Sequence, residues 1–303
     1  MFPHAEKCRE IEARVHSLTP GQFWIVCMTN QGGGHIFVDF VLSCTEGPLG
    51  SYPIFIFTTI PHGRLTSDPA ASRISSLAYH LSLSVPTRRV FSVFAPEPVA
   101  QIFASIWTEH NGIPLDPIQA EYYAAKLMFC DRGTLREGVT SPELRRAVVG
   151  DIPKAAQLCY EFAAKSTPFV LSRDKAHQEA TILVQNGQLW VHEITIPGEG
   201  TDIASIVAVT RTSETVAAIT KVYTNPTWRS RGCAERLTRR VCAQLLETKL
   251  YVVLYVAHDN PAAARVYEKV GFVKFDEPGS DVPGAERWLE LGFDRRRVDL
   301  GHW

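Results

Sequence analysis

The sequence predicts an α/β protein built in two parts, and three observations lead to this prediction. Short apolar runs suited to buried strands alternate with segments whose apolar positions recur at helical spacing. Gly, Pro and Asn residues separate the two kinds of segment. A length of 303 residues also exceeds what one domain usually needs, so two domains are expected.

The first half of the chain is expected to begin with two strands. The apolar runs 23–28 and 36–42 flank the segment 31–35, QGGGH, which is interpreted as a hairpin loop rather than a phosphate site. Two pairs of strand and helix follow. The strands are predicted at 54–60 and 90–95, and the helices at 69–83 and 98–110.

The polar segment 131–142 is interpreted as the boundary between two domains, 1–139 and 140–303. Ser141 and Pro142 suit the start of a helix. Helices are therefore predicted at 142–165 and 173–186, followed by strands at 189–196, 203–210 and 216–223. A helix from 234 to about 249, a strand at 251–257, a helix at 261–270 and strands at 272–276 and 286–293 complete the order.

Residues 222–234, VYTNPTWRSRGCA, are expected to bind an anion. They join the strand 216–223 to the following helix, with Asn225 and Pro226 at the turn. Gly232 has no Cβ, so a ligand can approach the backbone closely there. The first turn of a helix also leaves N–H groups free for phosphate oxygens. The segment therefore predicts a pyrophosphate site.

Residues 258–272, HDNPAAARVYEKVGF, predict a helix with defined ends. Asn260 suits the N-cap, Pro261 the first helical position and Gly271 a left-handed end. Tyr267 lies on the apolar stripe of this helix, so the first interpretation of its role is an ordinary core tyrosine.

Together the two motifs resemble the GCN5-related N-acetyltransferase (GNAT) superfamily. Arg229, Gly232 and Ala234 match its coenzyme A loop, whose pattern is Gln or Arg, two residues of any kind, Gly, any residue, then Gly or Ala. The resemblance covers about 141–295, its specific part is 216–272, and it is greatest to fungal stand-alone members. It implies the GNAT fold, an α/β fold of the α+β type in which helices flank a mixed, mostly antiparallel central sheet.

The resemblance also implies the activity of an acetyl-CoA-dependent N-acetyltransferase that passes the acetyl group directly to an amine. A small-molecule acceptor is expected. Two alternatives stay open: a non-catalytic module that binds coenzyme A or an acyl-CoA, and an acyltransferase with another acyl donor or acceptor. A P-loop phosphotransferase is disfavoured, because the loop lacks the Gly-Lys-Ser/Thr ending of that class.

Ten residues are expected from the resemblance to contact the coenzyme. Val222, Tyr223 and Thr224 would use main-chain groups to pair with the pantetheine amides, so their side chains are not decisive for binding. Two arginines of the loop are expected to bind the phosphates. The cysteine of the loop lines the cradle and is not assigned as a nucleophile. The ten residues are Val222, Tyr223, Thr224, Arg229, Ser230, Arg231, Gly232, Cys233, Ala234 and Asn260.

The resemblance makes Tyr267 the candidate general acid, because many members place a tyrosine here beside the thioester sulfur. A tyrosine pKa of about 10 and a thiol pKa of about 8.5 make full proton transfer slightly uphill in water. An amine of pKa about 10.4 must also lose a proton, so a base or a water is needed. His192, Glu193 and His258 are candidate bases of similar weight. Lys221 is on the strand where the family uses a carboxylate, and that strand carries no acid.

Composition favours a soluble, cytoplasmic protein. The net charge is −1, no apolar run approaches the roughly 20 residues that span a bilayer, and the N-terminus MFPHAEKCRE lacks the apolar core of a secretory signal. Both halves are near neutral, so neither a nucleic-acid partner nor a membrane is expected. The seven cysteines contain no Cys-x-x-Cys pair, so neither a disulfide framework nor a metal site is expected. The oligomeric state is not predicted.

The N-terminal half is interpreted as a diverged, non-catalytic repeat of the same unit. Its order of strand, helix, strand and helix is that of the C-terminal motif region, and Pro98 aligns with Pro261. Ala104 then stands where Tyr267 stands, and the segment 61–73 has no Arg-x-x-Gly-x-Ala loop. An unrelated α/β domain with a similar order of elements is the alternative.

Overall fold

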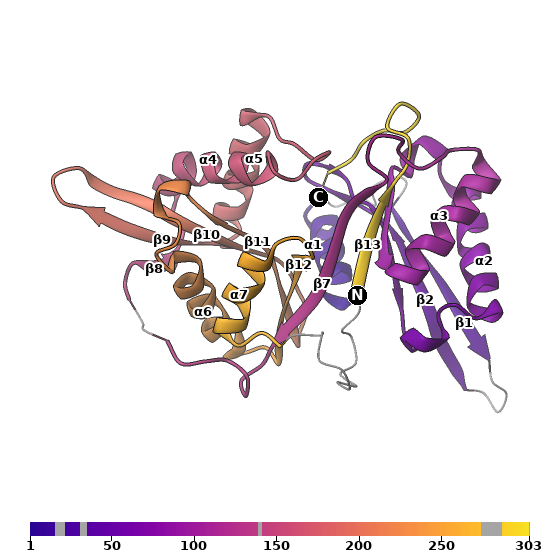
Figure 1. Ribbon diagram of the computed structural model, residues 1–303, viewed down its shortest axis with the longest axis horizontal. Helices are drawn as coiled ribbons and strands as arrows, with labels where there is room; N and C mark the ends of the chain where they lie inside the picture. The colour runs from indigo at the N-terminus through magenta and orange to yellow at the C-terminus, as the bar shows by residue number, and fades with distance from the viewer. Residues whose placement is uncertain (16–21, 31–34, 139–140, 274–286, 303) are drawn as a thin grey trace. The chain divides into compact units, whose positions relative to one another are not determined.

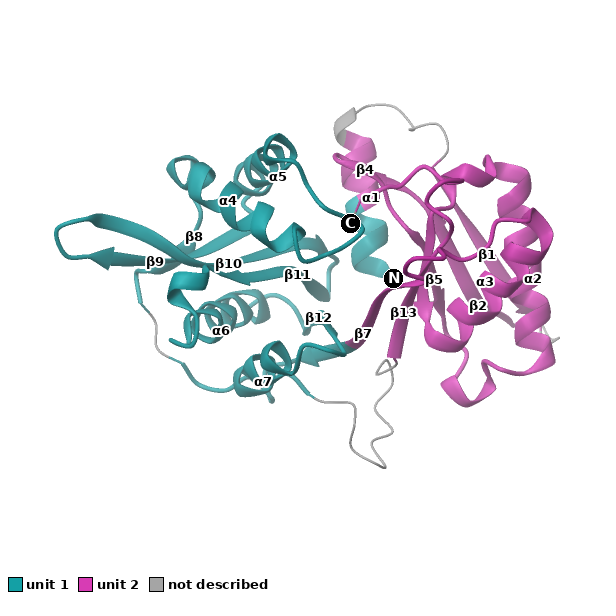
Figure 2. Ribbon diagram, turned by 45° about the horizontal axis from the view of Figure 1, so that its top comes forward, with its two compact units in different colours: residues 1–7, 127–285 teal, residues 8–126, 286–303 magenta. Residues whose placement is uncertain are grey.

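The computed structural model describes residues 1–15, 22–30, 35–138, 141–273 and 287–302. The chain divides into two compact units (Figure 2). Unit 1 comprises Met1–Lys7 and Leu127–Ala285, and unit 2 comprises Cys8–Lys126 and Glu286–Trp303. The helix α1 (Phe2–Val15), which the sequence analysis did not predict, spans the first of these divisions. The predicted loop residues 31–34 and strand residues 274–276 lie outside the described residues.

Unit 2 is a sheet with the strand order β1-β2-β5-β6-β13-β7, against which the helices α2 and α3 pack (Figure 1). Strands β5 and β6 are parallel, and the other neighbouring pairs are antiparallel. The elements are β1 (Phe23–Asn30), β2 (Ile36–Cys44), β5 (Ile54–Thr58), α2 (Asp68–Ser84), β6 (Ser92–Pro96), α3 (Glu97–Asn111), β7 (Glu121–Cys130) and β13 (Arg287–Gly292), with the minor elements β3 (Glu46–Gly47), β4 (Gly50–Ser51), η1 (His62–Arg64) and η2 (Thr87–Arg89).

Strand β13, which is distant in sequence from the other strands of unit 2, lies between β6 and β7 in its sheet. It pairs on one side with β6, where Trp288 lies opposite Pro96, and on the other side with β7, where Trp288 lies opposite Ala125. Glu290 is fully buried in this strand, and its Oε1 accepts a hydrogen bond from Ser92 Oγ at 2.6 Å. A buried carboxylate held in this way fixes the register of β13 against β6.

Unit 1 has the strand order β12-β11-β10-β9-β8 and a helix pair on each face (Figure 1). Strands β11 and β12 are parallel, and the other neighbouring pairs are antiparallel. The elements are β8 (Leu144–Arg146), η3 (Val149–Asp151), α4 (Ile152–Ala163), α5 (Arg173–Gln185), β9 (Leu189–Ile196), β10 (Gly200–Thr212), β11 (Val216–Thr224), η4 (Pro226–Trp228), α6 (Cys233–Leu246), β12 (Tyr251–Ala257) and α7 (Pro261–Val270).

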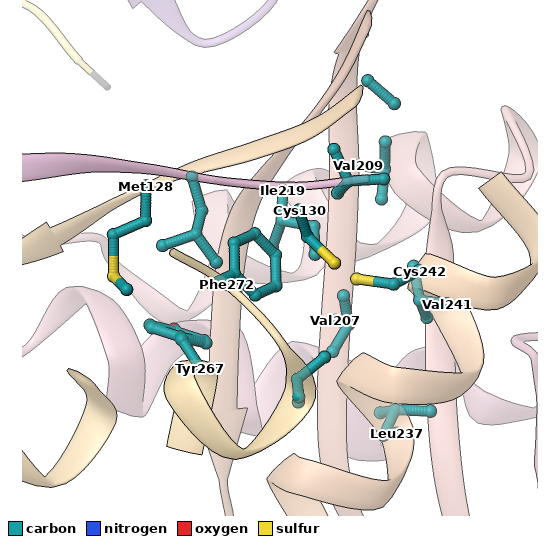
Figure 3. Packing of buried hydrophobic residues seen from close by; sticks show 14 of the residues in the cluster. Met128, Cys130, Val207, Val209, Ile219, Leu237, Val241, Cys242, Tyr267 and Phe272 are labelled. Atoms are coloured by element: carbon teal, nitrogen blue, oxygen red, sulfur yellow. The ribbon is translucent and has the colours of Figure 1, made fainter. Parts of the chain in front are cut away.

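Two hydrophobic cores cover the two faces of this sheet. Because side chains alternate along a strand, Trp190 of β9 packs into the core under α6 and α7, while Val191 packs into the core under α4 and α5. Figure 3 shows part of the first core, where Tyr267 lies near Met128 and the sulfur atoms of Cys130 and Cys242 point toward each other. All seven cysteines have free thiols.

Most predicted elements are confirmed, and the mixed, mostly antiparallel sheet flanked by helices is confirmed as well. The predicted helix 142–165 is wrong over its first part. Leu144–Arg146 instead forms β8, which pairs with β9, and the helix begins only at Ile152. The residues that mark the start of this helix are Asp151 and Pro153. Asp151 Oδ2 accepts a hydrogen bond from the Val148 N–H at 2.7 Å, and Pro153 lies in the first turn of the helix. Strand β7 was not predicted. The compact units also differ from the predicted domains 1–139 and 140–303, because residues 286–303 join unit 2.

The two units share the order of elements that the repeat hypothesis requires. In unit 2 the parallel strands β5 and β6 are joined through α2, and α3 follows. In unit 1 the parallel strands β11 and β12 are joined through α6, and α7 follows. Both second helices have proline in their first turn and end at a left-handed glycine, Gly112 and Gly271. Ala104 is buried on α3.

Candidate active site

Strands β11 and β12 separate from each other beyond their first halves. They pair from Val216↔Tyr251 to Ile219↔Leu254, whereas β11 continues to Thr224 and β12 to Ala257 with no pairing between these ends, which are both fully described. A bulge at Thr220 accounts for this, because it inserts one residue between the pairs that β11 makes with β10. The main-chain groups of residues 220–224 on the β12 side are therefore open to a ligand.

The loop after β11 contains two left-handed residues. Ser230 has φ 60°, and Gly232 has φ 71° and ψ 14°. Gly232 is the N-cap of α6, and the first hydrogen bond of this helix runs from the Arg236 N–H to the Gly232 carbonyl, at 3.1 Å. The N–H groups of residues 233–235 come before that bond and lie at the positive end of the helix dipole. The loop and helix start thus form a cradle whose N–H groups suit an anion, and its use for a phosphate group stays a prediction.

Arg229 holds this loop against β11. Its Nη2 donates to the Tyr223 hydroxyl at 3.0 Å, and its Nε donates to the Thr224 carbonyl at 3.3 Å. Two bonds from one planar guanidinium fix the turn that carries Gly232. The structure therefore gives Arg229 a bracing role besides its predicted role toward phosphate.

Two further guanidinium groups lie beside the cradle. Arg231 stacks on the Trp228 ring with its Cζ 4.9 Å from the ring centroid. Arg236 reaches back from the first turn of α6, and its Nη2 donates to Cys233 Sγ at 3.6 Å. A Cβ added to Gly232 would lie 3.0 Å from Arg236 Nη1. Arg236 was not among the predicted coenzyme residues, although its position one turn after Gly232 places it near the loop.

Cys233 is not activated by its place at the helix start. The residue is buried, and burial raises the pKa of its thiol, while the nearby charges of Arg236 and Arg231 act in the opposite direction. A thiol with a raised pKa stays protonated at neutral pH and is a weak nucleophile. The structure agrees with a lining role for this residue.

The helix α7 has the predicted ends. The Asn260 side chain accepts a hydrogen bond from the Ala263 N–H at 3.0 Å, and Gly271 ends the helix with φ 119°. A Cβ at Gly271 would collide with the carbonyl of Thr134. The helix therefore starts next to the open end of β12 and is fixed at both ends.

Tyr267 is buried on the α7 stripe, in the core that Figure 3 shows. Its ring meets the Phe272 ring edge to face, with centroids 5.8 Å apart. Burial raises the pKa of Tyr267, and the charge of Cys242 acts in the same direction. Among the described residues its hydroxyl has no hydrogen-bond partner. Tyr267 therefore keeps its proton at neutral pH and can donate it in a hydrogen bond.

The structure does not bring the three predicted bases together. His192 and Glu193 point to opposite faces of β9, and His258 lies exposed in the turn after β12. Glu193 is held by an ion pair with Arg145 at 3.1 Å, which also binds Asp151. This pairing engages the Glu193 carboxylate with a guanidinium group.

His192 lies under the coenzyme loop. The residue is 4% exposed, and burial lowers its pKa, as does the charge of Arg236. A contact with the Cys233 backbone and the charge of Glu143 oppose this shift. His192 is therefore neutral at pH 7, and its Nδ1 has no hydrogen-bond partner within the described part of the chain.

A polar row continues from His192 across the sheet. His192 lies opposite Ser205, and Ser205 lies opposite Thr224, so the three side chains share one face. The hydroxyl oxygens of Ser205 and Thr224 are 2.6 Å apart. The row ends on one of the predicted coenzyme residues, at the open end of β11.

Residues 155–272 match the model of the family described as Acetyltransferase (GNAT) family. The match runs from α4 to the residue after Gly271 and includes the open strands, the cradle and the Tyr267 helix. The chain contains a GNAT acetyltransferase domain. None of the curated proteins compared with the chain matches it.

Solved structures share the fold over nearly the whole chain. A GCN5-related N-acetyltransferase from Sphaerobacter thermophilus has a TM-score of 0.56 and 14% identity, covering 97% of this chain and 88% of its own. One from Kribbella flavida has a TM-score of 0.51 and 15% identity, covering 95% of both chains. An acetyltransferase from the GNAT family of Colwellia psychrerythraea has a TM-score of 0.51 and 10% identity, covering 93% of this chain and 90% of its own. The likeness extends over both units and concerns the fold alone, and the origin of the N-terminal half as a diverged GNAT-like repeat stays a prediction.

No group of three or more His, Cys, Asp or Glu side chains among the described residues could hold a metal ion. No helix in that part of the chain combines the length and the apolar character that crossing a membrane requires.

Proposed function

We propose that the chain is an acetyl-CoA-dependent N-acetyltransferase that passes the acetyl group directly to an amine of a small molecule. One observation carries this proposal. The strands β11 and β12 separate at a bulge, and the open end of β11 leads into a left-handed loop at the start of a helix. An extended chain with amide groups fits the open strand, and a pyrophosphate fits the helix start.

The donor would lie along the open end of β11 and the start of α6. Its phosphates would meet the N–H groups of residues 233–235 and the charges of Arg231 and Arg236. Its pantetheine amides would pair with the main chain of residues 222–224. The position of Gly232 supports this, because any side chain there would occupy the cradle and its φ is unfavourable for other residues.

Tyr267 would act as a hydrogen-bond donor rather than a full acid. As the amine nitrogen bonds to the thioester carbon, the carbon–sulfur bond breaks and its electron pair leaves on sulfur. The raised pKa of Tyr267 makes complete transfer of its proton to a thiolate of pKa about 8.5 more unfavourable. A hydrogen bond from the phenol in a site that excludes water would stabilise the thiolate without that transfer.

A calorimetric titration of the purified chain with acetyl-CoA tests the first half of the proposal. The complex is then incubated with benzylamine, 1,4-diaminobutane, glucosamine and lysine, and acetylated products are identified by mass spectrometry. Tight binding with amine-dependent product supports the proposal. Tight binding without product would favour a coenzyme-binding module, and no binding would remove the proposal.

A further inference from the structure

One carboxylate oxygen stands out from all others in the described residues. Oε2 of Glu161, on α4, is buried and has no hydrogen-bond partner there. The other oxygen, Oε1, accepts from Gln157 Nε2 at 2.7 Å. A buried carboxylate oxygen without a donor is unfavourable in a folded protein, and a catalytic role or a bound water or ion is among the explanations for such a group.

Glu161 faces the open end of β11 through Tyr223. Burial is the largest cause of the raised pKa of Tyr223. The charge of Glu161 and a hydrogen bond between the Tyr223 and Glu161 side chains act in the same direction, against the charge of Arg229 and the hydrogen bond from it. Tyr223 lies beyond Ile219↔Leu254, the last pair between β11 and β12. The free carboxylate oxygen thus lies on the α4 side of the strand to which we assign the pantetheine chain.

The neighbouring charges already have partners or lie farther away. Lys221 of β11 forms an ion pair with Glu179 of α5 at 2.6 Å. Arg229 binds the Tyr223 hydroxyl, and Lys165, just after α4, has its Nζ 5.7 Å from the centroid of the Tyr223 ring. No described cation therefore neutralises Glu161 Oε2 through a hydrogen bond.

We propose that Glu161 binds the amino group of the acceptor and takes up its proton. This inference rests on the proposed acetyl transfer and names its acceptor class, primary amines that are cationic at neutral pH. The amine N–H would donate to Oε2, the carboxylate oxygen that accepts no hydrogen bond from a described residue. A negative carboxylate also favours a cationic amine over neutral or anionic compounds of the same size.

The proposed step is balanced. The ammonium ion first gives one proton to water, and the neutral amine nitrogen then bonds to the thioester carbonyl carbon. The nitrogen, now positively charged, gives one proton to Glu161 Oε2. The carbon–sulfur bond breaks, its electron pair leaves on sulfur, and the protonated Glu161 passes the proton to the thiolate or to water. A carboxylate suffices because a nitrogen bonded to the carbonyl carbon is far more acidic than a free ammonium ion of pKa about 10.4.

The test compares Glu161→Gln, which keeps the shape and removes the charge, with Asp174→Asn, which removes an exposed charge from α5. Each variant is measured for acetyl-CoA affinity by calorimetry and for kcat/KM with the most active amine of the panel, from pH 6 to 10. Glu161→Gln should keep the acetyl-CoA affinity and lose about 10²- to 10⁴-fold in kcat/KM at pH 7. Asp174→Asn should match the wild type, and Glu161→Asp should recover part of the loss.

The pH profile separates this role from a structural one. Without Glu161, hydroxide or a second free amine has to take up the proton, so the rate of the variant should rise more steeply with pH than that of the wild type, and the deficit should shrink toward pH 10. A kcat/KM within twofold of wild type at pH 7, or equal losses of activity and acetyl-CoA affinity, would overturn the inference. Wild-type binding of acetyl-CoA without turnover of any amine would also overturn it. Failure of the wild type to bind acetyl-CoA would instead remove the proposed function, and this inference with it.

Discussion

Gly232→Ala should weaken acetyl-CoA binding by more than its effect on folding explains. Gly232 has φ 71°, where a residue with a Cβ is less stable by about 1–2 kcal/mol. The added Cβ would lie 3.0 Å from Arg236 Nη1, the flexible end of an exposed side chain, so packing adds little to this cost. The expected loss in the free energy of unfolding is therefore about 1–2 kcal/mol.

The chain offers a matched control at Gly198. This residue has φ 80°, lies in the turn between β9 and β10, and has open space where a Cβ would be placed. Gly198→Ala should therefore cost the same 1–2 kcal/mol, measured by urea unfolding of both variants. Any difference between the two in coenzyme affinity then reports on the cradle alone.

The effect on binding follows from the bonds at the helix start. A hydrogen bond from a backbone N–H to a charged phosphate contributes about 1.5–3 kcal/mol, so displacing one bond should raise the Kd roughly 10- to 150-fold. Calorimetry with acetyl-CoA should find this loss in Gly232→Ala and no change in Gly198→Ala. Equal affinities in both variants, with the stability loss present in both, would refute the assignment of the phosphate cradle.

Three further predictions concern single residues. Tyr267→Phe should lower kcat about 100-fold with unchanged acetyl-CoA affinity. The Tm should also stay unchanged, because the lost hydroxyl has no hydrogen-bond partner among the described residues. Full activity of the variant would mean that Tyr267 has only a packing role. Asn260→Ala should lose about 1 kcal/mol in urea unfolding, because the bond to the Ala263 N–H is removed, whereas Ser67→Ala at an N-cap without such a bond should lose less. The pKa of His192 in the folded chain lies below its ordinary value of about 6.5, so the unfolded chain binds the proton first as the pH falls. The free energy of unfolding therefore decreases below about pH 6.5, with a slope of at most about 1.4 kcal/mol per pH unit. His192→Gln should remove that part of the loss between pH 7.5 and 5.5, and identical pH profiles of urea unfolding would contradict this.

The elements that the sequence predicted best are those whose signals are local. Strand β12 and helix α7 have the predicted bounds, because an unbroken apolar run and the caps Asn260 and Gly271 lie within a few residues of them. The turn before α6 was located for the same reason, since Gly232, where the sequence predicted a close approach of a ligand to the backbone, lies within the motif and has a left-handed conformation. Its link to a family came from two such local motifs in the right order.

Features that depend on distant partners could not be predicted. Strand β7 has a mixed pattern, EYYAAKLMFC, and is stabilised by pairing with β13, which comes from the last residues of the chain. Leu144–Arg146 is a strand only because β9 lies beside it. Glu161 occupies an ordinary helical position in sequence, and only the folded chain places it next to Tyr223. Pairing with strands distant in the sequence therefore determines the structure of segments whose hydrophobic periodicity does not predict it.

The position of β13 has a consequence for the order in which the chain can fold during synthesis. A nascent chain leaves the ribosome with its N-terminal residues first, and domains usually fold in that order. Here β6 and β7 lack the strand that belongs between them until Arg287–Gly292 has been made. Two strand edges stay unpaired during this interval, and such edges are templates for association with other chains. Unit 2, although it begins near the N-terminus, therefore finishes folding only after nearly all of unit 1 has been synthesised.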